Sequence, residues 1–309
     1  MDAEVIGTSP TLLAPGETNA VGRMLGLLND EWTLLIVQRA LLGATRYGEF
    51  MAQLPISNAV LTGRLRRMTA DGMLEHVVYQ RSPTRAEYRL TPRSRSLWPM
   101  LMAIWDWERT WGPEQDRSLP SAHHQDCGSV FSPALSCAAC AAVTTDRDVR
   151  VHWGPSGTWQ RSLPAGANRL RPGAGVRSGE RGPFPQSMSL FGNRWSAAIL
   201  MAAFLGATRF SEFEAQVAAA PGSITERLKT FRSNGVLTET EGYRLTDKGR
   251  AFFPALVTAL QWAQKWYRAP EGDAVLVSHR PCGQRFTGVL ACDRCSRPLT
   301  GSAISACPA

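Results

Sequence analysis

The chain has 309 residues, of which 44% are hydrophobic and 19% charged, a balance typical of a folded protein and not of a disordered one. Its length suits two or more domains. No apolar run reaches the ~18 residues that a membrane-spanning helix needs, and the N-terminal region lacks the cationic flank of a secretory signal. We therefore expect a cytoplasmic protein that does not associate with membranes.

The formal charge of +8 at pH 7 favours a polyanionic partner. Only Lys229, Lys248 and Lys265 are lysines, so arginine carries nearly all of the positive charge. Arginine is better suited than lysine to forked recognition of phosphate and guanine. A GC-rich genome that favours arginine codons would give the same composition, and the sequence leaves both explanations open.

Taken in chain order, the first part of the sequence predicts a helix-rich unit. Apolar residues recur at helical spacing before Gly43, and Ser57 is suited to cap a helix that ends at Gly72. Alternating residues on either side of the turn RSPT then predict a two-stranded hairpin. The predicted elements are helices at 20–29, 32–42, 47–54 and 57–71, strands at 74–80 and 86–91, and a closing helix at 94–111. This order is that of a winged helix-turn-helix.

The same unit then occurs a second time. GATRYGEF at 43–50 returns 163 positions later as GATRFSEF at 206–213, and VLTGRLRRMTADGML at 60–74 is matched by SITERLKTFRSNGVL at 223–237. From the shared phrase YRLT onward the spacing shortens to 155. The expected fold is mainly α (α+β), with two winged helix-turn-helix domains in tandem, each followed by a small Cys-rich hairpin. The predicted domains are winged helices at 18–115 and 183–270, Cys-rich hairpins at 120–151 and 273–309, and a flexible basic Gly/Pro linker at 152–182.

The helix at 57–71 has the pattern of a DNA-recognition helix. Leu61, Leu65 and Met68 form its core stripe, so the small and basic residues on the opposite face are free to enter a major groove. The basic wing at 79–89 is suited to phosphates or the minor groove. A solvated basic helix face is the alternative. The candidate DNA contacts in the first unit are Asn58, Ala59, Thr62, Gly63, Arg64, Arg66, Arg67, Arg81 and Arg85.

The second unit departs from this pattern. Glu226 stands where the first unit has Gly63, and the shortened wing contains Glu239 and Glu241. A carboxylate in the middle of a reading face repels phosphate unless it accepts a hydrogen bond from cytosine. We expect the first unit to bind DNA strongly and the second weakly or not at all. The candidate contacts in the second unit are Thr225, Arg227 and Lys229.

Six of the seven cysteines belong to the repeat. Both copies read His-x2-Cys-Gly-x8-Cys-x2-Cys, which supplies the four ligands of a closed, structural zinc site. A metal-free hairpin with buried thiols, or a disulfide or thiol switch, would use the same residues, and His123 is an alternative ligand. The candidate ligands are His124, Cys127, Cys137 and Cys140 in the first copy and His279, Cys282, Cys292 and Cys295 in the second.

The run NDEWTLLIVQRALLGATRYGEF, followed by LTGRLRR and EYRLT, resembles the HxlR-type bacterial transcriptional regulators. The resemblance is close over 20–112 and looser over 183–268. It implies a winged-helix fold close to the MarR type, a homodimer formed through the first and last helices, and binding to palindromic operators in double-stranded DNA. Family members that sense oxidants carry a cysteine where this chain has Asn19 and Gly182, so redox sensing by that thiol is not expected. The two units either pair within one chain as a pseudo-dimer or the whole chain forms a homodimer.

We therefore expect a sequence-specific DNA-binding transcriptional regulator, and specifically a repressor. An enzyme is not expected, because no nucleophile–base pair or Gly-rich phosphate loop stands out. The alternative function is a protein-interaction or structural module with zinc hairpins and degenerate winged helices. Tryptophans on the last helices either line a pocket for a small-molecule effector or fill a core or dimer interface. These tryptophans are Trp105, Trp107, Trp111, Trp262 and Trp266.

Overall fold

The computed structural model describes residues 7–28, 30–82, 84–112, 119–163, 184–238, 240 and 242–306. The first unit has the predicted order of elements, and Asp30 caps its second helix by accepting a hydrogen bond from the Trp32 amide. Its elements are α1 (Ala20–Leu28), α2 (Glu31–Leu41), α3 (Tyr47–Gln53), α4 (Asn58–Ala70), β2 (Leu74–Arg81), β3 (Thr84–Leu90), α5 (Pro92–Arg95) and α6 (Trp98–Trp111). None of the described helices is long and apolar enough to cross a membrane.

The second unit repeats the helices, but its described residues contain no paired wing strands. Among the described residues between its recognition helix and the next helix, only an isolated bridge joins Leu237 to Leu245. The cause lies in the sequence, because this copy is shorter at the hairpin. Its helices are α8 (Pro185–Phe191), α9 (Arg194–Phe204), α10 (Phe210–Val217), α11 (Pro221–Ser233), α12 (Asp247–Arg250) and α13 (Phe253–Trp266).

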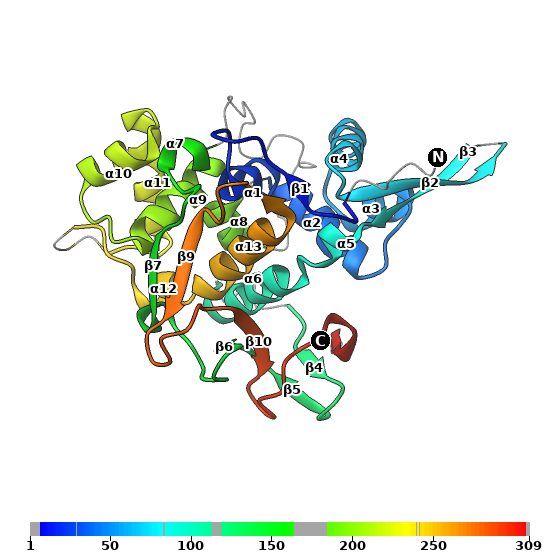
Figure 1. Cartoon of the computed structure of the whole chain (residues 1–309). Helices are drawn as coiled ribbons and strands as arrows, with labels where there is room; N and C mark the ends of the chain where they lie inside the picture. Colours follow the sequence, from blue (N-terminus) through cyan, green and yellow to red (C-terminus); the bar gives the residue numbers. More distant parts are fainter. Residues whose placement is uncertain are drawn as a thin grey trace.

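The two units pack on each other through their last helices. α6 lies against α13, α1 packs on α13, and α8 packs on α6 (Figure 1). The indole of Trp107 donates a 2.9 Å hydrogen bond to the Lys248 carbonyl, and that of Trp262 donates a 2.8 Å bond to the Arg93 carbonyl. These two bonds join equivalent positions of the two repeats in reciprocal directions. The tryptophans Trp107 and Trp262 therefore fill the interface between the units, and Trp262 also borders a cavity of about 640 Å³ beside α13.

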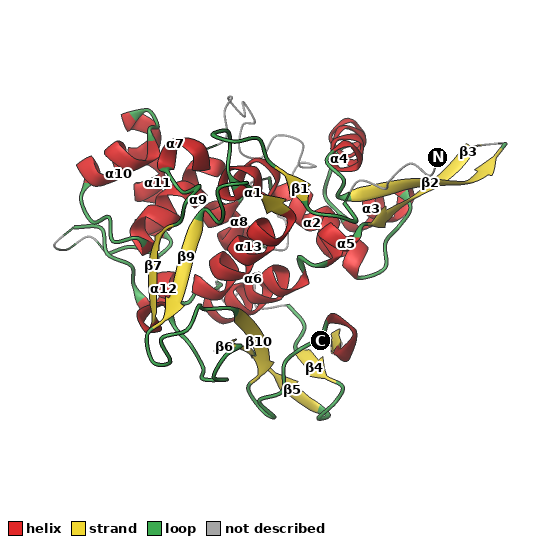
Figure 2. Ribbon diagram, in the orientation of Figure 1, coloured by secondary structure: helices red, strands yellow, loops and turns green. Residues whose placement is uncertain are grey.

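Strands from the two Cys-rich regions pair across the repeats. β6 (Pro133–Cys137) is antiparallel to β10 (Gly288–Cys292), β7 (Val149–Trp153) to β9 (Val275–His279), and β4 (Ala122–His124) to both β5 (Ser129–Phe131) and β11 (Ile304–Ala306). A short parallel pair, β1 (Thr11–Leu12) and β8 (Tyr267–Arg268), joins the N-terminal segment to the end of α13. Figure 2 shows these strands around the α6–α13 pair. Neither Cys-rich region is therefore the self-contained hairpin that the sequence predicted.

The predicted linker begins later than expected. Residues 152–153 complete β7, and α7 (Trp159–Ser162) packs on α1. Asn19 fixes this segment, because its amide donates to the Ser156 carbonyl at 3.0 Å and to the Ser162 hydroxyl at 2.9 Å. The Gly/Pro-rich composition therefore did not reveal that residues 152–163 pack against the rest of the protein. Residues 164–183 of the predicted linker lie outside the described residues. The buried side chains of both repeats form one continuous core.

Candidate DNA-binding surface and metal clusters

The outward face of α4 is solvent-exposed, as the periodicity predicted. Leu61, Leu65 and Met68 are buried at 0%, 0% and 2% relative exposure. Figure 1 shows α4 and the β2–β3 hairpin at the same end of the molecule. The exposed residues on the predicted reading face are Asn58, Ala59, Thr62, Gly63, Arg66 and Arg67.

The middle of this face is open. A Cβ added to Gly63 would meet nothing within 4 Å. Arg66 forms no ion pair or hydrogen bond with any residue that the structure describes. Arg67 is partly engaged, since its Nε lies 3.6 Å from an Asp71 carboxylate oxygen. Arg66 is thus the cation of this face that is most available to a ligand.

The N-terminal end of α4 is held by Tyr47 from α3. The Tyr47 hydroxyl donates to the Asn58 carbonyl at 3.1 Å and to Asn58 Oδ1 at 3.0 Å, and it lies 3.2 Å from Thr62 Oγ1. Ser57 occupies the N-cap position, as predicted, but its side chain makes no capping hydrogen bond. The side chains of Asn58 and Thr62 are therefore both in contact with the Tyr47 hydroxyl on the surface of α4.

The prediction that Arg64 contacts DNA does not agree with the structure. Arg64 is only 8% exposed, and its guanidinium forms an ion pair with Asp30 at the start of α2. Burial raises the pKa of the Asp30 carboxyl, whereas Arg64 and the Trp32 amide act in the opposite direction. Arg64 lies beside the buried stripe of α4. At such a position helical periodicity alone does not tell whether a side chain is buried or exposed. The ion pair joins α4 to the residue that caps α2.

The wing presents its arginines to solvent. Arg81 pairs with Thr84 and Arg85 with Gln80 in the β2–β3 register, and both arginines are exposed. Arg89 is engaged by Glu87, whose carboxylate accepts a hydrogen bond from it at 2.9 Å. The tip of the wing is therefore the more available basic region.

The equivalent surface of the second unit is exposed but differs in charge. Glu226 is 67% exposed in its side chain and lies 3.7 Å from Arg227, whose side chain is only 17% exposed. The Thr225 hydroxyl donates to the Pro221 carbonyl at 3.0 Å, and Lys229 is exposed. The acidic wing residues Glu239 and Glu241 lie outside the described residues. On this face the exposed cation Lys229 therefore lies on the same helix as the exposed carboxylate of Glu226.

The eight predicted metal ligands gather in two clusters, but each cluster mixes the repeats. The ligand atoms of each cluster all lie within 4.8 Å of one another. The sequence predicted one ligand set within each copy, and the structure corrects this, because the strands that carry the ligands pair across the repeats. One cluster contains His124, Cys127, Cys292 and Cys295, and the other contains Cys137, Cys140, His279 and Cys282.

The spacing in both clusters suits a tetrahedral metal. His124 Nδ1 lies 3.3 Å from Cys127 Sγ and 3.4 Å from Cys295 Sγ, and the sulfurs of Cys127 and Cys292 are 3.9 Å apart. Zinc–sulfur bonds of ~2.3 Å in a tetrahedron give sulfur–sulfur edges of ~3.8 Å, whereas a disulfide needs ~2.05 Å. These six cysteines are free thiols. His123 belongs to neither cluster, and Cys307 lies outside the described residues.

The electrostatics of the first cluster favour a thiolate at Cys127, whereas burial raises the pKa of the Cys292 thiol. Burial opposes ionisation of the Cys127 thiol, but hydrogen bonds from the Ser129 amide and the His124 ring outweigh it and lower the pKa of Cys127 to about 6. In the second cluster the pKa of the Cys137 thiol is also lowered, against the effect of burial, by hydrogen bonds from the Ala139 and Cys140 amides. Thiolate is the form that binds metal.

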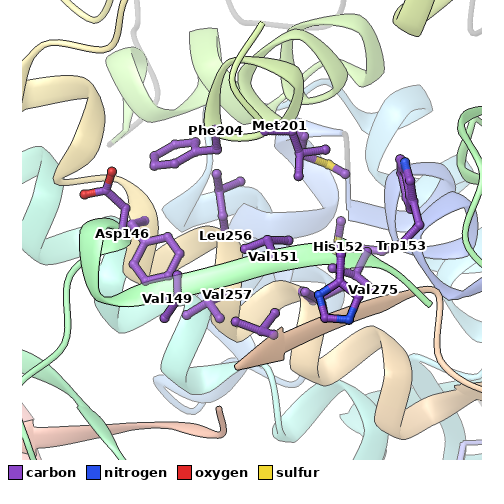
Figure 3. A pocket seen from close by; sticks show the side chains of 15 residues that line it. Asp146, Val149, Val151, His152, Trp153, Met201, Phe204, Leu256, Val257 and Val275 are labelled. Carbon is purple, nitrogen blue, oxygen red and sulfur yellow. The ribbon is translucent and has the colours of Figure 1, made fainter. Parts of the chain in front are cut away.

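Two apolar cavities lie where a strand from one repeat covers helices of the other. Figure 3 shows the cavity between the β7–β9 ribbon, α9 and α13, whose volume is about 100 Å³. Val151 and Phe204 are among the apolar side chains that line it. The equivalent cavity of the first unit lies between α2, α6 and β11 and has a volume of about 650 Å³. Trp98, Trp105 and Arg39 line this larger one.

Comparison with known proteins gives the family. A model described as HxlR-like helix-turn-helix matches residues 27–116 and again residues 190–271. This chain belongs to the HxlR-like helix-turn-helix family. It is 34% identical to the HTH-type transcriptional regulator Rv3095 of Mycobacterium tuberculosis over 139 residues, which are 45% of this chain and 88% of that protein. It is also 34% identical to the HTH-type transcriptional regulator YvaP of Bacillus subtilis over 90 residues, or 29% and 83% of the two chains.

The family match supports the sequence-based fold assignment, since both matched regions coincide with the two winged-helix units. The first region contains α2 to α6 and the second contains α9 to α13. Helix-turn-helix regulators are not an enzyme class. The Cys-rich strands and the two Cys/His clusters lie largely beyond the regions that the family model matches.

Proposed function

We propose that this HxlR-like protein is a DNA-binding transcriptional repressor that reads its operator with α4 of the first unit. The observation that carries the proposal is the open face around Gly63, flanked by Arg66, which has no partner among the residues that the structure describes. A helix with small central residues fits into a major groove, and an adjacent arginine is suited to guanine or phosphate. The wing tip, with Arg81 and Arg85, contacts the backbone or the minor groove beside it. The protein acts in the cytoplasm, where its DNA partner lies.

We infer that the two units contribute unequally. Glu226 replaces Gly63 at the centre of the second reading face, and the paired wing strands of the first unit have no described counterpart. The α6–α13 packing supports a pseudo-dimer within one chain, which takes the place of the family's homodimer. Such a chain recognises one strong half-site instead of a symmetric palindrome.

We also infer that the cofactor is structural zinc. Three sulfurs and one imidazole nitrogen are the donors that Zn²⁺ accepts in closed structural sites, and both clusters offer this set at tetrahedral spacing. Hard ions such as Mg²⁺ or Ca²⁺ prefer oxygen donors and are not suited to these clusters.

The larger cavity supports an effector that combines an apolar body with an acidic group. Its volume of about 650 Å³ lies in the usual range for small-molecule sites. Trp98 and Trp105 supply apolar walls, and Arg39 offers a half-buried cation whose Nε has no hydrogen-bond partner among the described residues. Burial lowers the pKa of Arg39, and a carboxylate would compensate that loss of solvation. Aromatic carboxylates should therefore raise the melting temperature of the wild-type chain more than their neutral amides, and Arg39→Gln should abolish the difference. An equal response to both ligand series would contradict this site.

The DNA-binding proposal is tested by selecting bound sequences from a random DNA pool and measuring the selected sequence by mobility shift across a range of salt. A specific regulator should prefer its site over other DNA by ~10³-fold or more. Arg66→Ala should cost ~1–3 kcal/mol if Arg66 reads a base, or reduce the salt slope by about one if it binds phosphate. Lys229→Ala, the equivalent change in the second unit, is the matched control and should have little effect.

The outcomes separate the alternatives. No enrichment of any sequence would favour the protein-interaction module over the regulator. Equal losses from Arg66→Ala and Lys229→Ala, together with a two-fold symmetric site, would show that both units read DNA and would contradict the asymmetry.

A further inference from the structure

The metal ligands of each repeat are divided between the two clusters. In each repeat the His and the first Cys stand at and just after the end of one strand, and the Cys-x2-Cys pair stands at and just after the end of another. The first pair of the first repeat, His124 and Cys127, meets the Cys-x2-Cys pair of the second repeat, Cys292 and Cys295. The reverse combination forms the other cluster, so each contains exactly half of its ligands from each repeat.

The pairing of the backbone strands supports this division of the ligands between the two clusters independently of the side chains. β6 and β10 are equivalent strands of the two repeats, and they pair with each other so that Leu135 faces its own counterpart Leu290. This pair therefore marks a local two-fold axis between the repeats. Further out, Val149 pairs with His279, and the equivalent Ile304 pairs with His124. The terminal strand of each repeat thus crosses to the ligand-bearing strand of the other.

Both histidines are oriented as metal ligands. His124 directs Nδ1 at two sulfurs, and His279 Nδ1 lies 3.2 Å from Cys282 Sγ and 3.4 Å from Cys140 Sγ. His124 Nε2 lies 3.6 Å from an Asp126 carboxylate oxygen and forms no hydrogen bond with the described residues. The opposite nitrogen of His279 has a polar partner, since His279 Nε2 lies 3.3 Å from Thr144 Oγ1. A metal-bound imidazole usually has such a partner for its other nitrogen. Both rings are fully buried.

We propose that the two clusters are zinc clamps, each of which joins the first repeat to the second through two ligands from either side. This inference rests on the proposed cofactor and adds a function for it: the metal fixes the two winged-helix units as a pseudo-dimer. Binding releases protons from the thiols and links four ligands from distant parts of the chain in each site. In Figure 1, β4, β6 and β10, at whose ends ligands stand, lie on the opposite side of the α6–α13 pair from α4 and α11.

Two variants with equal numbers of substitutions test the pairing. The cluster variant removes every ligand of one observed cluster and leaves the other complete, so it should bind one zinc per chain. The repeat variant removes every ligand of the first repeat and leaves each observed cluster with two ligands, so it should bind none. The cluster variant is His124→Ala, Cys127→Ser, Cys292→Ser, Cys295→Ser, and the repeat variant is His124→Ala, Cys127→Ser, Cys137→Ser, Cys140→Ser. Zinc per chain is measured by inductively coupled plasma mass spectrometry on purified full-length protein.

Pairing within each repeat predicts the reverse result, namely no zinc in the cluster variant and one in the repeat variant, and that result would overturn the clamp. Wild-type protein that takes up no zinc would overturn the proposed cofactor itself, whereas two zinc ions with the reversed variant pattern would overturn only the crossed pairing. The variants are compared after confirming their helical content by circular dichroism.

A measurement on the native chain decides the matter if a variant does not fold. Zinc is withdrawn stepwise with a chelator, and exposed thiols are alkylated and quantified by peptide mass spectrometry. The crossed clamps predict that Cys127 loses protection together with Cys292 and Cys295, and that Cys137 and Cys140 lose protection together with Cys282. If Cys127 instead follows Cys137 and Cys140 as one group, the proposal is wrong.

Discussion

Arg64 provides the sharpest test of how α4, the proposed DNA-reading helix, is held, because sequence and structure assign Arg64 different roles. The Arg64 and Asp30 side chains are each only 10% exposed, so their ion pair is nearly shielded from solvent. Arg64→Met would leave the Asp30 carboxylate buried with only its backbone hydrogen bonds from Trp32 and Thr33 and the more distant charge of Arg67. Removal of one partner from a buried ion pair costs roughly 3–5 kcal/mol, and we expect about 3 kcal/mol here.

The second unit suggests the compensating change. There Asn193 replaces the aspartate and still caps its helix, with the Trp195 amide donating to Asn193 Oδ1 at 2.9 Å. The double variant Arg64→Met, Asp30→Asn therefore removes both charges and keeps the cap, since Asn and Asp are about equally good N-caps. We expect its stability to return to within roughly 1 kcal/mol of the wild type, because a buried ion pair is often replaceable by neutral residues.

The direction in which pH changes the stability penalty of Arg64→Met follows from the pKa of Asp30. Burial raises the pKa of Asp30 above its ordinary value in the folded state, so ionisation of this group lowers stability as the pH rises through the folded pKa. Loss of Arg64 raises that pKa further. The penalty of Arg64→Met should therefore be largest at pH 7 and shrink as acidification protonates Asp30.

Urea unfolding at pH 7 and at pH 5, followed by tryptophan fluorescence, measures these differences, and fluorescence anisotropy measures the affinity for the selected DNA. If the double variant is as unstable as Arg64→Met, the ion pair is not the source of the penalty. If it is stable but binds DNA ~1–3 kcal/mol more weakly, Arg64 reads a base and the positional role is refuted.

Three further predictions concern the reading face, the local two-fold axis and the metal. Gly63→Glu should lower DNA affinity by about tenfold or more, ~1.4 kcal/mol, without loss of stability, whereas Gly63→Ala should bind normally in the same mobility-shift assay; an unchanged affinity for the glutamate variant would place the reading face elsewhere. Leu290→Ala should cost ~2–5 kcal/mol in urea unfolding, because Leu290 is 2% exposed and packs at the pairing of β6 with β10; a cost below 1 kcal/mol would mean that this pairing contributes little. A chelator should lower the melting temperature measured by calorimetry, and Zn²⁺ but not Mg²⁺ should restore it, since thiolates disfavour hard ions; restoration by both would argue against the sulfur-rich clusters.

The sequence predicted those features that depend on local periodicity. The stripe of Leu61, Leu65 and Met68 was enough to orient α4, because a helix fixes the angle between successive side chains. It was not enough to place Arg64, since that required knowing that Asp30 approaches from α2. Burial at the edge of a stripe depends on the neighbouring element and not on the helix itself.

The metal clusters show a second limit of the same kind. The repeated spacing correctly identified the ligand residues that the structure brings together, but it could not divide them between sites, because both copies contain the same pattern. The division depends on β6 pairing with β10, a contact between residues far apart in the chain. The docked segment at 152–163 was missed for a related reason, since its order depends on partners such as Asn19.

Duplication also explains how the asymmetry of the two reading faces could persist. In a homodimer every substitution appears twice, so a glutamate at the reading face would weaken both half-sites. In this chain the reciprocal bonds of Trp107 and Trp262 hold the two units together without any contribution from α11. The second unit can therefore retain the core that the interface needs while its wing is shortened and its small central residue is replaced. Its buried Ile224, Leu228 and Phe231 remain at 0%, 1% and 0% exposure while the outward face has changed. A unit under selection for packing alone would be expected to show this combination of a maintained inner stripe and a changed outer face.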